Sequence, residues 1–149
     1  MNLKRICLFL VLISMVAVGT MFAQTVRFGV FIEMKTATTG LISFADSSGR
    51  FILDDEPCWF KSTTPIEKGK SYTGAITRMA TKTDSVTGEK RPGIIIREFG
   101  NRGIFIHEGN NVSWSDNCIV LKRDKMMIMW NYIKNAGFMD QYVISIAVF

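Results

Sequence analysis

Residues 103–121 have the sequence GIFIHEGNNVSWSDNCIVL, in which two short apolar runs enclose a polar segment rich in Gly, Asn and Ser. The apolar runs, residues 104–106 and 118–121, predict strands because turn-forming residues lie beside each of them. The polar segment contains two turns, and the second of them, residues 115–117, lies directly before the second strand. These turns allow the chain to return beside the first strand, so the stretch favours a β-rich fold.

Strand patterns continue on the N-terminal side of this stretch. Residues 26–34 alternate between apolar and mostly polar side chains, which is the period of a strand with one strongly apolar face. Residues 100–103 predict a tight hairpin connection between two strands. Residues 81–92 predict a mobile loop, because glycine, proline and polar residues dominate there. The shorter strand candidates are residues 40–45, 50–53, 71–79, 94–99 and 103–107.

The C-terminal part of the chain predicts one helix and one strand. The helix has Asp124 as a candidate N-cap and Gly137 as a candidate C-cap. Residues 141–149 follow as a strand with two apolar faces, which indicates a position inside the sheet. We therefore expect a mainly β protein of the α+β class, with one C-terminal helix followed by a final strand. An apolar stripe at helical spacing indicates core packing, with a binding groove as the alternative, and consists of Met126, Met129, Trp130 and Ile133.

The N-terminus has the pattern of a secretory signal peptide. Lys4 and Arg5 precede an apolar run, which ends in small residues up to Ala23. Cleavage after Ala23 makes residues 1–23 the leader and leaves residues 24–149 as a single domain. An uncleaved anchor is the alternative, because 18 mostly apolar residues are the shortest length that spans a bilayer. We expect an exported bacterial protein, periplasmic or secreted, that meets the membrane only through its leader.

The charge pattern excludes some classes of partner. The chain carries 18 basic and 13 acidic side chains, and loss of the two basic leader residues lowers its formal net charge from +5 to +3. The remaining basic residues are dispersed, whereas a nucleic-acid partner usually requires a clustered basic face. A lone histidine without an acidic cluster provides no metal-ligand set. We therefore expect no nucleic-acid partner, no metal and no cofactor, and the sequence does not indicate an oligomeric state.

The chemistry-bearing pair of the chain is Cys118 and His107, its only histidine, which lies eleven residues earlier. A cysteine attacks as its thiolate, and a nearby imidazole can accept the thiol proton and later deliver it to a leaving group. The turn before Cys118 contains Ser115 and Asn117, and backbone amides of such a turn can form an oxyanion hole.

Three other readings of these residues stay open. Cys118 is alternatively a small buried apolar side chain, and His107 a hydrogen-bonded structural residue. In an oxidising compartment, Cys58 and Cys118 could instead form a disulfide. Such a pairing would exclude a thiol nucleophile.

The motif around these residues resembles a known family. A His-x-Gly-Asn pattern followed by Cys-Ile, with a serine three residues before the cysteine, resembles domain-of-unknown-function family 5675 of phage and bacterial proteins. More remotely it resembles the active-site pattern of L,D-transpeptidases. The similarity covers residues 26–149, but Asn117 replaces a glycine usual in transpeptidases and Val120 an arginine. The matching residues are His107, Gly109, Asn110, Ser115, Cys118 and Ile119.

This resemblance implies a fold and an activity. The fold is an L,D-transpeptidase-like mixed β sandwich or barrel. Cys118 would attack a carbonyl of a peptidoglycan stem peptide, with His107 as base and then acid, in acyl transfer or hydrolysis. Ser115 would position the histidine or substrate, and amides near Asn117, Gly109 and Asn110 would form the turn and oxyanion site. The alternative is an exported, non-catalytic module that binds cell-wall material or protein.

Overall fold

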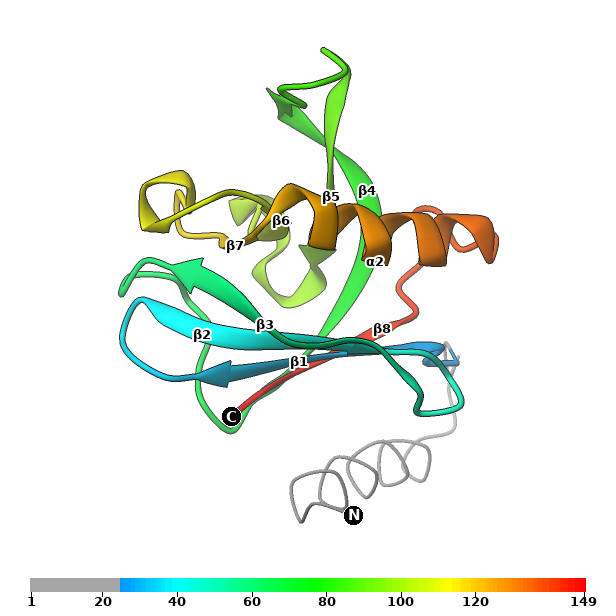
Figure 1. Ribbon diagram of the computed structural model, residues 1–149, viewed down its shortest axis with the longest axis horizontal. Coiled ribbons are helices and arrows are strands. Elements are labelled where there is room, and N and C mark those ends of the chain that lie inside the picture. The colour runs from blue at the N-terminus through cyan, green and yellow to red at the C-terminus, as the bar shows by residue number, and fades with distance from the viewer. Residues whose placement is uncertain (1–24) are drawn as a thin grey trace.

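The computed structural model describes residues 25–149, which fold into a closed β-barrel with one helix packed on it (Figure 1). The mainly β class, the single C-terminal helix and the final strand are confirmed. The predicted leader, residues 1–23, lies outside the described residues.

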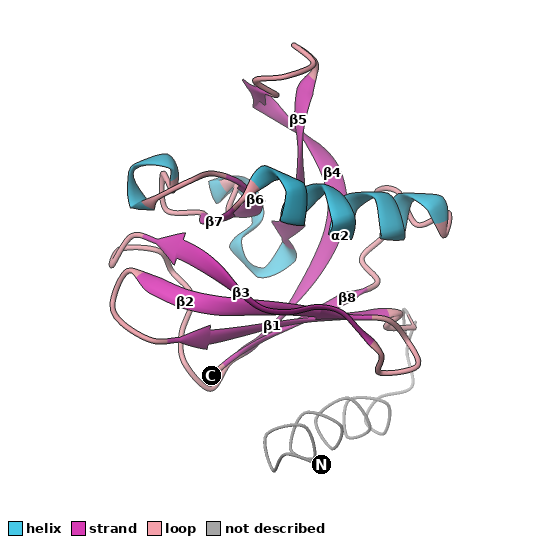
Figure 2. Cartoon of the chain, viewed as in Figure 1, coloured by secondary structure: helices cyan, strands magenta, loops and turns pink. Residues whose placement is uncertain are grey.

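Figure 2 distinguishes the strands, helices and loops of these residues. The strands are β1 (Phe28–Met34), β2 (Thr39–Ala45), β3 (Phe51–Phe60), β4 (Ser71–Thr83), β5 (Lys90–Ile96), β6 (Phe105–Glu108), β7 (Ile119–Leu121) and β8 (Ile144–Val148). The helix is α2 (Arg123–Asn135), and two short 3-10 helices are η1 (Arg97–Arg102) and η2 (Val112–Trp114).

The strands close in the order β1-β2-β3-β7-β6-β5-β4-β8. Strand β8 pairs parallel with β1 and antiparallel with β4, so the final strand lies inside the sheet as its two apolar faces predicted. The other parallel pair is β6 with β7, in which His107 lies opposite Val120. A parallel pair needs a crossover connection, and the segment after Glu108 supplies it.

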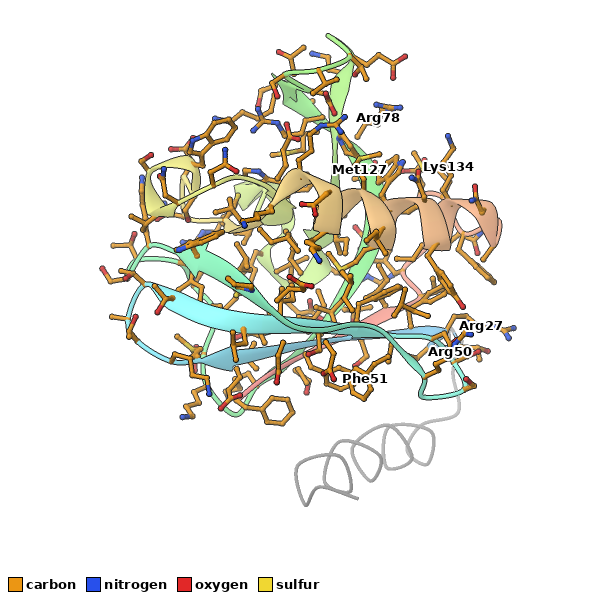
Figure 3. The ribbon with its side chains drawn as sticks, in the orientation of Figure 1. Arg27, Arg50, Phe51, Arg78, Met127 and Lys134 are labelled. Carbon is orange, nitrogen blue, oxygen red and sulfur yellow. The ribbon has the colours of Figure 1, made fainter. Side chains whose placement is uncertain are left out.

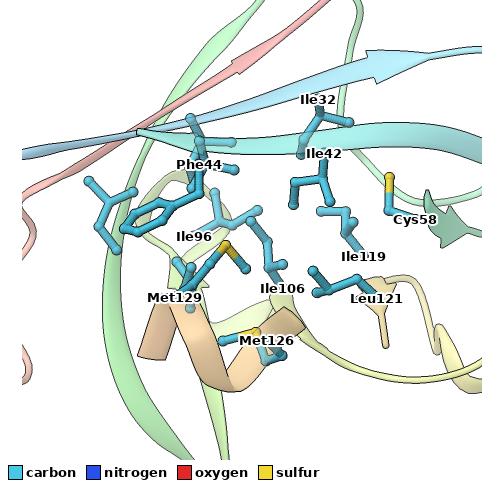
Figure 4. Close-up of a cluster of buried hydrophobic side chains, with 14 of the residues drawn as sticks. Ile32, Ile42, Phe44, Cys58, Ile96, Ile106, Ile119, Leu121, Met126 and Met129 are labelled. Atoms are coloured by element: carbon cyan, nitrogen blue, oxygen red, sulfur yellow. The ribbon is translucent and has the colours of Figure 1, made fainter. Parts of the chain in front are cut away.

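The core lies between two layers of the molecule. In Figure 1, β1, β2, β3 and β8 lie on one side of the core, and α2 with β5, β6 and β7 lies on the other. Side chains from both layers meet in the interior, where Ile32 and Ile42 of the first layer share one cluster with Ile106, Leu121 and Met129 of the second (Figure 4). Because side chains alternate along a strand, the neighbours of these isoleucines face outward.

Helix α2 owes its position to its apolar stripe. Met126, Met129, Trp130 and Ile133 are all buried in the core, so the core interpretation of the stripe is confirmed. The guanidinium of Arg78 lies 5.6 Å from the centre of the Trp130 ring, above the helix (Figure 3).

The helix ends differ from the prediction. The N-cap position is Lys122 instead of Asp124, and no side chain of the described residues caps it. At the other end Ala136 is the C-cap, and Gly137 follows with a φ of 86°, the left-handed conformation that glycine adopts at little cost.

Three strand boundaries were predicted wrongly. The loop expected over residues 81–92 is shorter than predicted, because its two ends belong to β4 and β5. Only residues 84–89 form the turn, which Asp84 closes by accepting bonds from the Val86 and Thr87 amides. This hairpin projects from the barrel (Figure 1). Strand β3 continues to Phe60 through an irregular stretch in which Asp55 has a φ of 54°. The connection expected as a tight hairpin is η1, and it begins directly after β5.

Candidate functional site

Strands β6 and β7 bring His107 and Cys118 to the same face of the barrel wall. His107 pairs with Val120, two residues beyond Cys118, and alternation therefore points all three side chains outward. The thiol lies level with Phe105, whose amide donates a hydrogen bond to Sγ at 3.4 Å. Cys118 and His107 are thus diagonal neighbours, a relation that separates Cα atoms by about 7–8 Å in a sheet.

The Cys118 thiol is enclosed in the resting structure. Its residue is 4% exposed and packs with Met79 and Phe105. Sγ also donates to the Gly103 carbonyl at 3.8 Å. Burial raises the pKa of the thiol, the Phe105 amide opposes this rise, and Asp116 adds to it. The thiol therefore rests in its neutral form.

The His107 ring is buried and neutral. Its Nδ1 lies 2.7 Å from the Glu108 carbonyl oxygen, which can only accept, so Nδ1 carries the proton. Among the described residues Nε2 has no hydrogen-bond partner. Burial lowers the pKa of His107 to about 4, the Glu108 carbonyl opposes this, and the charges of Arg91 and Lys82 lower it further. Nε2 therefore presents an unused lone pair.

Ser115 forms hydrogen bonds that hold the turn before Cys118. Its fully buried hydroxyl donates to the Cys118 carbonyl at 2.5 Å and accepts from the Lys61 amide at 3.2 Å. These bonds tie the turn to the end of β3. The Cys118 amide donates to the Ser115 carbonyl at 2.5 Å, so it is not free to serve an oxyanion as predicted. The Ser115 hydroxyl and the Cys118 amide are thus both engaged in closing this tight turn.

Asn117 takes a left-handed backbone conformation. Its φ is 66°, and asparagine tolerates this region better than most residues. Its Oδ1 accepts a hydrogen bond from Thr63 at 2.5 Å. The preceding Asp116 also has a positive φ, 40°. The turn before Cys118 therefore holds two successive non-glycine residues in a costly conformation.

Gly109 and Asn110 begin the crossover between β6 and β7. The Gly109 amide donates to the Leu121 carbonyl at 2.8 Å. A Cβ at Gly109 would lie 2.8 Å from Cβ of Val120 and 2.9 Å from Cβ of Trp114, so glycine is required by close approach. Asn110 is exposed at the start of the loop. Both residues belong to the turn, as predicted.

The disulfide alternative is wrong. Cys58 pairs with Leu121 in the barrel wall and faces the core (Figure 4), whereas Cys118 faces outward. Within residues 25–149 both cysteines carry free thiols. Burial raises the pKa of Cys58 to about 12, against a weak opposing hydrogen bond from the Gly40 backbone.

A buried ionic cluster beside His107 was not predicted. The Glu108 carboxylate, 5% exposed, lies 3.3 Å from Nε of Arg91 and 3.1 Å from Nε of Arg123. Arg123 also bonds to Asp84 at 3.0 Å. The cluster ties the β4–β5 hairpin to α2 and β6, and it engages the guanidinium of Arg123.

Two lysines near Cys118 were also missed. Lys82 of β4 and Lys61 after β3 both approach the Asp116 carboxylate. Lys82 lies within the segment expected to be a loop, and Lys61 follows a strand that was predicted too short. No local signal in the sequence connects either residue with Cys118.

Within residues 25–149 no group of three or more histidine, cysteine or acidic side chains could hold a metal ion. Across the same part of the chain, no helix has the length and apolar character needed to cross a membrane. Comparison of the chain with protein-family models, with curated proteins and with solved structures finds no match.

Proposed function

We propose that the protein is an exported thiol enzyme in which Cys118 carries out acyl transfer or hydrolysis on peptidoglycan stem peptides. The observation that carries this proposal is the unpaired Nε2 of His107, buried on the same face as Cys118. The proton on Nδ1 leaves Nε2 as the acceptor, which is the tautomer that a general base requires.

The reaction has a simple balance of protons and bonds. Nε2 of His107 takes the thiol proton, and the sulfur of Cys118 attacks the substrate carbonyl carbon. As the C–N bond breaks, the imidazolium returns this proton to the leaving amine, and a thioester remains on Cys118. Water or an acceptor amine then attacks the thioester, and the released sulfur recovers a proton as the free thiol.

The resting geometry requires a movement before this chemistry. Within the described chain, no hydrogen bond joins Sγ of Cys118 to the His107 ring. Catalytic hydrogen bonds are often absent from unliganded enzymes and form when substrate binds. A change of side-chain rotamer brings diagonal neighbours on adjacent strands into reach of each other. The proposal therefore predicts that substrate binding moves the groups that enclose Cys118, among them Met79 and Phe105.

The compartment and motif support a wall substrate. The basic and apolar pattern of residues 4–23 predicts export, and peptidoglycan lies outside the cytoplasmic membrane. The motif that ends in Cys118 and Ile119 resembles that of enzymes that act on peptidoglycan. These two arguments are independent of the geometry of the histidine.

A second candidate is a non-catalytic binding module. The observation that favours it is the closed state of the thiol, together with the apolar side chains on the crossover loop. Val112 and Trp114 are 38% and 37% exposed, and the Arg91 guanidinium lies 5.5 Å from the centre of the Trp114 ring. Such a surface can bind a ligand without chemistry at Cys118.

Turnover of purified peptidoglycan fragments, followed by mass spectrometry, decides between these functions. We expect product from the wild type and from Cys58→Ala, because Cys58 faces the core. Cys118→Ala should abolish turnover, and His107→Gln should reduce it by about 100-fold or more, the usual contribution of general acid–base catalysis. Fragment binding without turnover, or turnover that persists in Cys118→Ala, would instead overturn the thiol mechanism.

A further inference from the structure

We infer that Lys82 and Lys61 form a recognition site for a substrate carboxylate beside Cys118, and that Asp116 occupies this site in the resting protein. This inference rests on the proposed role of Cys118 as the nucleophile. It assigns the site a preference for acyl substrates that carry a carboxylate close to the scissile carbonyl.

Three parts of the chain meet at this position. Lys82 lies near the end of β4, Lys61 follows β3, and Asp116 belongs to the turn directly before Cys118. Nζ of Lys82 lies 2.6 Å from one oxygen of Asp116, and Nζ of Lys61 lies 3.7 Å from the other. The two ammonium groups thus approach one carboxylate from opposite oxygens.

The charges of this group do not cancel. Two lysines share one carboxylate, and among the described residues neither lysine has a second acidic partner. Two of these charges, Asp116 and Lys82, act on the thiol in opposite directions. Burial is the main cause of the raised pKa of Cys118, and among charged groups Asp116 raises it further while Lys82 lowers it. An anion placed here lies within the electrostatic range of the nucleophile.

Asp116 can be displaced at small cost. Its side chain is 56% exposed and that of Lys82 is 40% exposed. Exposed ion pairs contribute little to stability, because water screens both charges. A substrate carboxylate can therefore exchange with that of Asp116 without a large loss.

Displacement also acts on the turn directly before Cys118. Asp116 and Asn117 have φ angles of 40° and 66°, a region that side-chain-bearing residues seldom adopt. The contact with Lys82 is one of several that hold this turn, beside the Thr63–Asn117 bond and the hydrogen bonds of Ser115. Exchange of the carboxylate therefore removes one restraint on a strained turn that bonds directly to the backbone of Cys118.

Alkylation of Cys118 by two reagents of different charge tests this inference without a peptide substrate. Iodoacetate is anionic and iodoacetamide is neutral, and the two rates at Cys118 are measured by peptide mapping. The ratio of the iodoacetate rate to the iodoacetamide rate reports the local charge. Any effect of turn opening changes both rates equally, so it cancels in this ratio.

We expect the ratio to fall about two- to fivefold in Lys82→Gln and in Lys61→Gln, and to rise by a similar factor in Asp116→Asn. In 1 M salt these differences should vanish, because the screening length falls to about 3 Å. The matched control is Lys134→Gln, at the far end of α2 (Figure 3), which should leave the ratio unchanged.

The outcomes separate this inference from the proposed function. Equal ratios in wild type, Lys82→Gln and Asp116→Asn would overturn the carboxylate site, even if peptide turnover depends on Cys118. If the alkylation ratio changes in these variants but no peptide turnover depends on Cys118, the acyl-transfer proposal is overturned. The anion site beside a non-catalytic thiol would then remain.

Discussion

The barrel wall formed by β3, β7 and β6 has two faces, and each contains a buried cysteine. Cys58 lies on the inner face among apolar side chains, which raise the pKa of its thiol to about 12 and give it no polar side-chain neighbour within the described core. Cys118 lies on the outer face, where Asp116 and Lys82 act on the thiol and the ring of His107 is nearby. Burial alone therefore does not mark a functional thiol.

The two faces also differ in how fully their groups are satisfied. The inner face is apolar and close-packed, so its side chains are in van der Waals contact with one another. The outer face retains an unpaired His107 Nε2 and a turn with two positive φ angles. Unused polar capacity and a strained backbone are features that packing alone does not require. The comparison can be tested first at the inner face.

Ile106→Ala should give the largest loss of stability, about 2–5 kcal/mol, because it leaves a cavity in the barrel interior. Ile106 is fully buried, whereas Ile128 on the outer side of α2 is 40% exposed. The control Ile128→Ala should change the free energy of unfolding by about 0.5 kcal/mol or less. Urea denaturation measures both, and similar losses in the two variants would contradict the assignment of the inner face.

The pH dependence of stability tests the outer face. Burial lowers the folded-state pKa of His107 from 6.5 to about 4, so the unfolded chain binds more protons between these values. The contribution of the neutral His107 ring to the free energy of unfolding is therefore fully present above pH 6.5. It falls by up to about 3 kcal/mol as the pH drops toward 4. His107→Gln should flatten this part of the profile. Parallel profiles for the two proteins from pH 7 to pH 4 would show that the ring is not buried in neutral form.

Ser115→Ala should cost about 1–3 kcal/mol, because it removes a buried hydroxyl that makes two hydrogen bonds. The matched control is Ser113→Ala, since the Ser113 hydroxyl is exposed and bonds only locally to Asn111. Its expected effect is within about 0.5 kcal/mol. Thermal unfolding of both variants measures the difference, and equal midpoints would mean that Ser115 does not hold the turn before Cys118.

Much of the fold could be predicted from local patterns. The alternation in residues 26–34 and 141–149 reflects one or two buried strand faces, and the stripe of α2 reflects its packing on the sheet. The β4–β5 hairpin was missed because a long two-stranded projection exposes polar residues on both faces, so its composition resembles that of a loop. The second half of β3 was also missed, because Asp55 and Pro57 are residues that are typical of turns.

The candidate site was predictable only in part. The motif identified His107 and Cys118, and the turn chemistry identified Asn117 and Gly109. The hydrogen bonds that Ser115 and the Cys118 amide make within the turn were not predicted, because they depend on how the turn closes on itself. Lys82 could not be connected with Cys118, since the two are 36 residues apart and meet through the pairing order of the barrel.

The sequence by itself determined which segments form strands, where the helix lies and which two residues bear the candidate chemistry, because these follow from side-chain periodicity and residue type. Only the tertiary structure decided that Cys58 and Cys118 lie on opposite faces and that His107 is buried with a free Nε2. It also decided that two distant lysines share the Asp116 carboxylate. Contacts and pKa values depend on which strands become neighbours, and that pairing is set by the whole barrel and not by any local stretch.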